Sequence, residues 1–207
     1  MSPGRDPVVG WRLWRVRGSQ LESWAASCGW EPGTNEARCL APIRRCQHPP
    51  GRGCRCGFWA LFSPLRCFER ARAERAERSS VLGLVRGWGE VALHGEEGFR
   101  AERAAVICLF TDWAWDAPVM PQPARGPARL WWGLLATLRY VPRPVAADPW
   151  RKHALEDAAS NYGVPLLSLK DGLQIGLLEE LGVDAAMQRE IEAWIEQVGH
   201  GRMWRSD

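Results

Sequence analysis

The sequence lacks several features that would assign it to a common class of protein. No apolar run approaches the roughly 18–20 residues that a membrane-spanning helix needs, so we expect no membrane partner. The first residues, MSPGRDPVVGWRLW, contain no short apolar segment followed by a small-residue cleavage site. We therefore expect no signal peptide and a cytoplasmic location.

Basic residues are numerous, but the protein is not strongly basic. The formal net charge is only +3, far from the global positive field that is typical of a strong nucleic-acid binder. Lys152 and Lys170 are the only lysines, so almost all positive charge is arginine. Arginine together with abundant Ala, Gly and Pro is also the product of a GC-rich genome. By itself it is weak evidence for phosphate binding.

Motifs of the common enzyme families are missing as well. The chain contains no nucleophile elbow, no Walker loop and no dinucleotide-binding fingerprint. We therefore favour a binding protein over an enzyme. An enzyme that uses His94 and Glu102 for acid–base catalysis remains an alternative.

The chain does contain enough apolar residues for a sizeable core. Of its 207 residues 46% are hydrophobic, and we expect most of the 13 tryptophans to lie in the core and some to line a pocket. The seven cysteines are an odd number, and a reducing compartment disfavours a disulfide framework. The cysteines therefore need another explanation.

The order of the hydrophobic patterns predicts an α+β fold. VVGWRLWRV (8–16) alternates as a strand, and GFWALF (57–62) is a short apolar strand or turn. Residues 81–93 and 99–110 flank HGEEG as a hairpin. Glycines inside the first hairpin strand predict a bulge or sharp coiling, as in a small closed barrel. The expected core is a mixed or antiparallel, small β-barrel-like sheet with a zinc knuckle, followed by C-terminal helices.

Three regions follow from these patterns. Residues 1–115 form a zinc-knuckle β domain, and residues 116–147 form a proline-rich connection with a short apolar element. Residues 148–207 form a C-terminal helical region with one short strand, VPLLSL (164–169). The amphipathic helices of that last region supply a buried apolar stripe.

Four cysteines and a histidine gather in EARCLAPIRRCQHPPGRGCRCGFWA (36–60). Zinc binds about four Cys or His ligands in a tetrahedron, held by a chain that turns sharply. Cys54 and Cys56 are spaced C-x-C before Gly57, and a Pro/Gly-rich turn follows His48. Thiolate and imidazole together suit zinc better than calcium or magnesium. Free thiols and a disulfide are the alternatives.

Five candidate ligands compete for about four places. The ligands that we predict for a structural Zn²⁺ ion are Cys39, His48, Cys54 and Cys56. Cys46 lies in the basic run RRCQ and looks incidental, although it could replace one of the four. With all positions filled by protein side chains, no place is left for water or substrate, so the ion would be structural.

Two segments resemble a family of largely uncharacterised actinobacterial proteins. They are CRCGFWA (54–60), preceded by His48, and GLVRGWGEVALHGEEGFRAERA (83–104), and the opening VVGWRLWRV also fits. The resemblance covers roughly residues 8–110 and none of the C-terminal helices. The positions that carry it are Cys39, His48, Cys54, Cys56, Gly57, Trp59, Ala60, Trp88, Gly89, His94, Gly98, Phe99, Arg100, Ala101 and Glu102. The resemblance supports the metal ligands and a shared site, and implies no activity.

The second of these segments offers a candidate ligand pocket. Arg100 and Glu102 are two residues apart, so on a strand they project from one face, and His94 lies at the hairpin turn. Arg100 could bind an anion or a base edge and Glu102 could orient it, while Trp88 or Phe99 stacks on a planar ring. The alternative is an Arg–Glu pair that only stabilises the hairpin.

Three hypotheses about function remain open. The first is a zinc-stabilised module, similar in style to PUA or EVE domains, that binds nucleic acid or a nucleotide through a Trp/Arg-lined pocket. The second is an adaptor that binds a protein partner, or a second copy of itself, through a Trp-rich surface and the amphipathic C-terminal helices. The third is the enzyme that uses His94 and Glu102.

Overall fold

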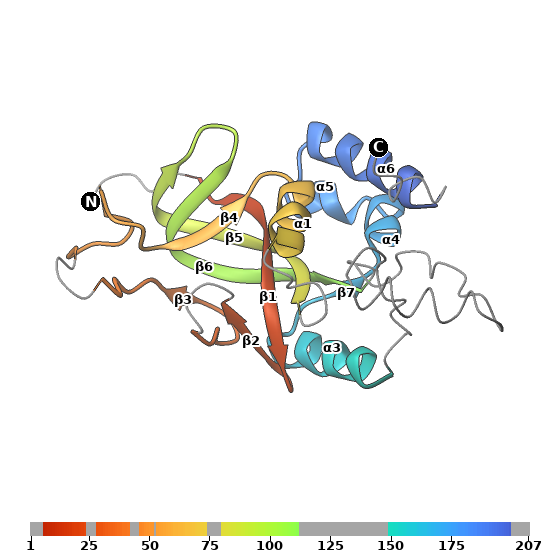
Figure 1. Ribbon diagram of the computed structural model, residues 1–207, viewed down its shortest axis with the longest axis horizontal. Helices are drawn as coiled ribbons and strands as arrows, with labels where there is room; N and C mark the ends of the chain where they lie inside the picture. The colour runs from red at the N-terminus through yellow and green to blue at the C-terminus, as the bar shows by residue number, and fades with distance from the viewer. Residues whose placement is uncertain are drawn as a thin grey trace, which may run out of the picture.

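The computed structural model describes residues 6–23, 28–41, 46–51, 53–73, 80–111 and 149–199 (Figure 1). The strands are β1 (Val8–Arg17), β2 (Gln20–Ser23), β3 (Asn35–Glu36), β4 (Phe58–Leu61), β5 (Ser80–Leu93), β6 (Gly98–Phe110) and β7 (Leu166–Leu167). The helices are α1 (Pro64–Ala73), α3 (Pro149–Tyr162), α4 (Leu169–Gln174), α5 (Leu177–Glu180) and α6 (Ala185–Gly199). The predicted proline-rich connection, 116–147, lies outside the described residues.

The described strands form one mixed sheet of seven strands, which together with the helices confirms the α+β fold. β5 and β6 form the long antiparallel hairpin that the sequence predicts, with Leu93 opposite Phe99 near the turn and Leu82 opposite Phe110 at the far end. β1 pairs antiparallel with both β5 and β2. β7, from the C-terminal region, pairs parallel with β6.

The hairpin is irregular where glycines interrupt β5, as predicted. A register shift between Trp88 and Val91 coincides with Gly89, whose φ of +78° is one that side chains with a Cβ rarely adopt. At Gly87 an added Cβ would lie 2.4 Å from the ring of Phe99. The glycines therefore let the buried Phe99 ring lie directly against the neighbouring strand.

Four strands pair in a closed cycle. β1 pairs with β5, β5 with β6, β6 with β4, and β4 pairs back to β1 through Trp11 and Leu61. Gly98 makes the approach of β4 to β6 possible, since an added Cβ there would lie 2.1 Å from the carbonyl oxygen of Ala60. The end of β4 is thereby held against the start of β6, while Phe58 at the start of β4 pairs with Ala101. The knuckle (residues 39–56) directly precedes β4.

The C-terminal helices complete the core of the sheet. Tyr162 of α3 belongs to a hydrophobic cluster with Trp14 and Phe99, and its hydroxyl accepts a hydrogen bond from Leu21 N and donates one to Trp30 O. A second cluster joins strand residues, among them Trp11, Leu84 and Phe110, to Leu178 of α5 and Ile191 of α6. The described part of region 148–207 therefore shares both cores with region 1–115.

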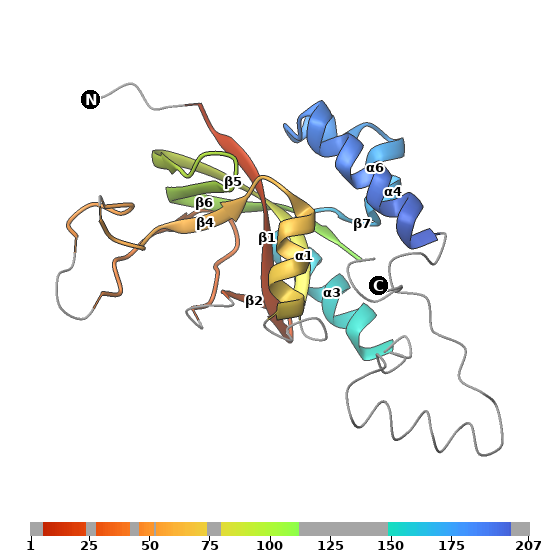
Figure 2. The same ribbon diagram turned by 45° about the horizontal axis from the view of Figure 1, so that its top comes forward.

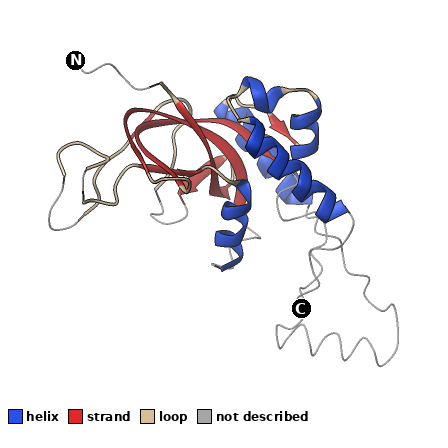
Figure 3. Ribbon diagram, turned by 90° about the horizontal axis from the view of Figure 1, so that it is seen from above, coloured by secondary structure: helices blue, strands red, loops and turns tan. Residues whose placement is uncertain are grey.

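The knuckle projects from the end of the sheet that lies away from α4–α6 (Figures 1 and 2). Seen from above, the loops gather on one side of the curved strands and the helices on the other (Figure 3). Among the described residues, no helix combines the length and the apolar character needed to cross a membrane. The fold thus presents the knuckle on a segment that the helical part does not cover.

Candidate metal centre

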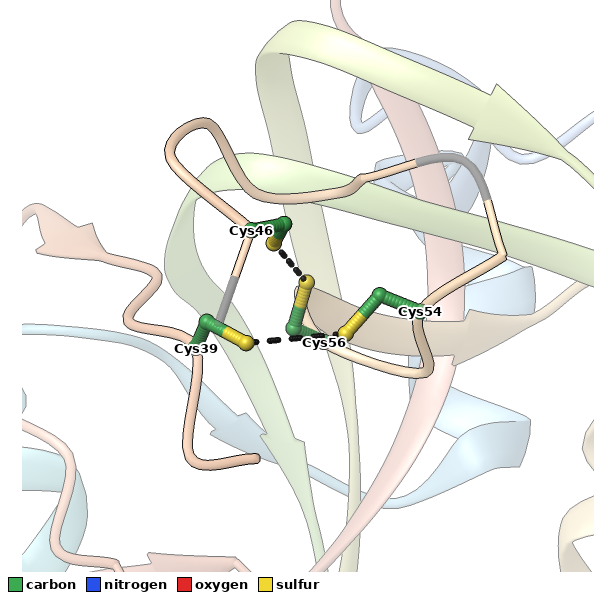
Figure 4. Close-up of side chains that lie close together, drawn as sticks. All are labelled: Cys39, Cys46, Cys54 and Cys56. Carbon is green, nitrogen blue, oxygen red and sulfur yellow. Dashed lines mark hydrogen bonds between the residues drawn. The ribbon is translucent and has the colours of Figure 1, made fainter. Parts of the chain in front are cut away.

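Four cysteine side chains from separate points of the knuckle converge (Figure 4). Cys39 follows β3, Cys46 precedes the Pro/Gly-rich turn, and Cys54 and Cys56 immediately precede β4. The four Sγ atoms all lie within 4.8 Å of one another, and all four residues are half-buried. The described residues thus place four thiols where they could hold a metal ion.

The sulfur–sulfur distances fit coordination and exclude a disulfide. Sγ of Cys46 lies 3.1 Å from Sγ of Cys56, and Sγ of Cys39 lies 3.5 Å from Sγ of Cys54, whereas a disulfide bond is about 2.05 Å long. With Zn–S bonds of about 2.3 Å, the edges of a regular ZnS₄ tetrahedron are about 3.8 Å. The thiols therefore need to move by only a few tenths of an ångström to about 1 Å to accept an ion.

Glycines allow the chain to turn this tightly around the sulfurs. An added Cβ at Gly51 would lie 2.6 Å from Cβ of Cys46, so a larger residue would push this thiol out of place. Gly51 N donates a hydrogen bond to Sγ of Cys56 (3.5 Å), and Cys54 N donates one to Gly51 O (3.2 Å). Gly57 has a φ of +104°, and an added Cβ there would lie 3.2 Å from the carbonyl oxygen of Ala101. The C-x-C-G segment can therefore lie directly on β6.

The environment of the free thiols makes them unequal as acids. Hydrogen bonds from the backbone of Ala41 and Cys46 lower the pKa of Cys39 from its ordinary 9.0 to about 7. A hydrogen bond with the Cys56 thiol, followed by burial, raises the pKa of Cys46 to about 12. For Cys54 the backbone of Cys56 lowers the pKa, but bonds with the thiols of Cys56 and Cys39 outweigh it and raise the pKa. Cys39 is therefore a stronger acid than Cys46 or Cys54 in the metal-free group.

The fourth member of the group differs from the predicted one. The structure brings together Cys39, Cys54 and Cys56, as expected, but the group includes Cys46 and does not include His48. His48 is exposed in the turn, because the chain reverses there so that Gly51 can pack on Cys46. Among the described residues, the group that could hold a metal therefore consists of four thiols, and His48 lies outside it.

Two residues of the predicted ligand pocket lie directly beside the knuckle. Arg100 is only 7% exposed and donates hydrogen bonds to the carbonyl oxygens of Cys54 and of Cys56 (3.2 Å). Its Nε donates to Nε2 of His94 at 2.8 Å. His94 in turn stacks on Trp59, with ring centroids 4.6 Å apart and an interplanar angle of 20°. Arg100 is thus bonded to the loop that carries the thiols, and His94 is bonded to Arg100.

The other predicted pocket residues have separate places in the hairpin. Phe99 is fully buried in the first hydrophobic cluster. Glu102 accepts a hydrogen bond from Glu90 N at 3.0 Å, beside the Gly89 bulge. Trp88 is half-buried in β5. Phe99 and Glu102 therefore contact the protein itself and stabilise the hairpin.

Two residues that were not predicted as ligands or pocket residues contribute to this region. The Trp59 ring lies 5.2 Å from Cζ of Arg100, and its Nε1 donates to Arg55 O at 3.0 Å. On the other side of β4, Arg12 donates to Trp59 O and to Ser23 Oγ (3.0 Å). The resemblance includes Trp59, but no local pattern points to a buried Arg12. The start of β4 is thus held by two arginines from different strands.

Comparison of the chain with protein-family models, with curated proteins and with solved structures gave no match. The functional argument therefore depends on the geometry of the site.

Proposed function

We propose that the protein is a zinc-stabilised binding module. The proposed ligands of its single structural Zn²⁺ ion are Cys39, Cys46, Cys54 and Cys56. The observation that carries the proposal is the convergence of these four thiols to within 4.8 Å of one another. Zinc is commonly bound by four thiolates in a tetrahedron, and such a closed site leaves no position for water or substrate. The ion would hold the knuckle folded.

Further features support a compact module of this kind. The closed cycle of pairings β1–β5–β6–β4 fits the small barrel-like core, similar in style to PUA or EVE domains, that the glycine-bearing strands predict. The resemblance to the actinobacterial family covers Cys39, Cys54 and Cys56 but not Cys46, so we propose that its members share these three ligands of the centre. A reducing cytoplasm, where thiols stay available for metal, is the location that we propose.

The charge of the knuckle favours an anionic partner, and we propose nucleic acid or a nucleotide. Residues 37–57 contain five arginines and no acidic residue, so this segment carries +5 while the whole chain carries +3. Arg38 and Arg55 are exposed, and the half-buried Trp59 is hydrogen-bonded to the backbone of Arg55. Arginine contacts phosphates and an aromatic ring stacks on a base, so this combination suits a single-stranded nucleic acid.

The adaptor hypothesis receives less support. The apolar residues Leu178 of α5 and Ile191 of α6 are buried in the second hydrophobic cluster. That part of the helical surface is therefore already used inside the chain, and it is not available to a partner.

The zinc centre is tested by metal analysis of freshly purified protein, which distinguishes zinc from iron. We expect one zinc per chain in the native protein and none in Cys54→Ser. Retention of the zinc by Cys54→Ser would exclude this site.

The anionic partner is tested separately, by binding of a mixed-sequence single-stranded RNA at several salt concentrations. We expect affinity to fall as salt rises, and the paired change Arg38→Ala and Arg55→Ala to reduce the salt slope by about one to two, roughly one for each phosphate contact. Arg66→Ala, which removes an exposed arginine from α1, is the matched control. An RNA affinity that does not change with salt concentration, or an equal reduction of the salt slope in Arg66→Ala, would exclude nucleic acid as the partner.

A further inference from the structure

Arg100 is a buried cation without an acidic partner in the part of the chain that the structure describes. Its side chain is nearly inaccessible, with 7% of the residue exposed. Its hydrogen bonds go to two backbone carbonyl oxygens, those of Cys54 and Cys56, and to a ring nitrogen of His94. A buried charge is costly unless an opposite charge lies nearby. Neutral acceptors alone therefore do not account for a guanidinium at this position.

The guanidinium is also held in one orientation. His94 accepts through Nε2, which fixes the direction of the Arg100 Nε–H bond. Trp59 lies under both groups, 5.2 Å from Cζ of Arg100 and 4.6 Å from the His94 ring. β4 and β6 pair with Trp59 opposite Arg100, so the sheet itself sets this spacing. The orientation of the Arg100 guanidinium is therefore set by the protein before any metal binds.

The negative charge that would balance Arg100 lies on the thiolates of Cys54 and Cys56, the two residues whose carbonyl oxygens it contacts. Four thiolates around a divalent cation carry a formal charge of −2. Cys54 and Cys56 each supply a thiol to the group and a carbonyl to Arg100, so the buried cation and the metal centre share one short stretch of backbone. We propose that Arg100 is the counter-charge and the positioning residue of the metal centre, an inference that rests on the proposed zinc site.

The proposal assigns Arg100 two effects on the ion. Its hydrogen bonds fix the carbonyls on either side of Arg55 and thereby hold the C-x-C turn so that both sulfurs face the ion. Its charge offsets the excess negative charge of the tetrathiolate and so favours the metal-bound state over the metal-free thiols. The first effect depends on the shape of the side chain, and the second depends on its charge.

A pair of variants separates these effects. Arg100→Gln removes the charge but retains an amide donor, and Arg100→Lys retains the charge but loses the planar fork. Zn²⁺ affinity is measured on the full-length chain by competition with a chelator at constant pH. We expect Arg100→Gln to bind Zn²⁺ roughly 10- to 100-fold more weakly than the native protein, within the range found for partners of metal ligands. Arg100→Lys should recover part of this loss.

Controls keep the outcome specific. Arg86→Gln removes an exposed arginine of β5 by the same change of side chain, and should leave Zn²⁺ affinity unchanged. Absorption of the Co²⁺-substituted proteins should show a tetrahedral four-sulfur site in all Arg100 variants. Equal affinities of the native, Arg100→Gln and Arg100→Lys proteins would overturn the role of Arg100 and leave the zinc site standing. Absence of Zn²⁺ binding by the native protein would instead overturn the zinc site.

Discussion

Cysteines in two regions of the molecule differ in burial and in grouping. Cys67 of α1 and Cys108 of β6 are buried among apolar side chains, and this burial raises the pKa of each thiol to about 12. The four cysteines of the knuckle are half-buried, lie side by side, and include Cys39, whose pKa is lowered to about 7. Burial among apolar groups keeps a lone thiol protonated and inert. In the knuckle the pKa of Cys39 alone is lowered, while contacts between the thiols raise the pKa of Cys46, so it is the convergence of the four sulfurs that suits a cation.

The largest effect should follow the loss of one sulfur from the knuckle. Cys54→Ser leaves a site with three thiols, and we expect the metal to be lost. Because metal binding contributes directly to folding, the free energy of unfolding should fall by more than about 3 kcal/mol. For a chain of this length such a change lowers Tm by roughly 6–12 °C. Calorimetry of the native protein and the variant measures it. An unchanged Tm would mean that the knuckle contributes nothing to the fold.

A change in the backbone next to the sulfurs should have a smaller effect in the same direction. Gly51→Ala places a Cβ 2.6 Å from Cβ of Cys46, and we expect overpacking to cost about 1–3 kcal/mol and to weaken metal binding. Gly29→Ala is the matched control, because nothing lies within 4 Å of an added Cβ there. Equal Zn²⁺ affinities of the two variants in chelator competition would argue against close packing around Cys46.

The core cysteines should show the reverse pattern. Cys67→Ser puts a hydroxyl into the second hydrophobic cluster, where Cys67 is 2% exposed, and we expect a loss of about 1–3 kcal/mol in unfolding free energy. Zinc content should stay at the native level. Denaturant unfolding and metal analysis of the same sample give both numbers, and loss of zinc from this variant would break the distinction between the two regions.

The smallest effect, without any mutation, is a difference in reactivity with pH. In chelator-treated folded protein, Cys39 should react with iodoacetamide faster than Cys46 and Cys54 near neutral pH, because its rate rises through pH about 7 whereas the pKa of each of the other two is raised. Cys67 and Cys108 should stay unmodified until the protein unfolds. Mass spectrometry of the alkylated peptides reports each site, and modification of Cys108 at the rate of Cys39 would contradict the account.

The same shifts set opposite pH dependences of stability. Cys67 and Cys108 keep their protons up to a pH of about 12, so their stabilising contribution is complete below the unfolded value of 9.0 and is lost as pH rises above it. For Cys39 the folded pKa is the lower one, so its contribution to the metal-free protein is present above pH 9.0 and is lost as pH falls through about 7. Chelator-treated protein should therefore lose stability at both ends of this range.

Local patterns predicted much of the fold and most of the site. Alternation around HGEEG located the hairpin, and glycine spacing located the bulge near Gly89, since both depend on neighbours in sequence. The C-x-C-G spacing placed Cys54 and Cys56 together for the same reason. The return of β4 to β1 and the packing of α5 and α6 on the sheet depend on contacts between distant residues, which no local pattern specifies.

The choice between Cys46 and His48 could not be made from spacing. Both precede the Pro/Gly turn, and only the path of the chain around Gly51 decides which side chain faces the other sulfurs. The basic run around Cys46 argued against it as a ligand, but the charge of its neighbours in sequence does not determine where its thiol points. The hydrogen bonds of Arg100 to the carbonyl oxygens of Cys54 and Cys56 join residues more than 40 positions apart, so local sequence patterns could not predict them either.

Metal content of two variants of the knuckle tests the central claim most directly. The account predicts one zinc per chain in the native protein and in His48→Ala, and no zinc in Cys46→Ser. Zinc retained by Cys46→Ser but lost from His48→Ala, or a native protein purified under reducing conditions that binds no zinc, would contradict it.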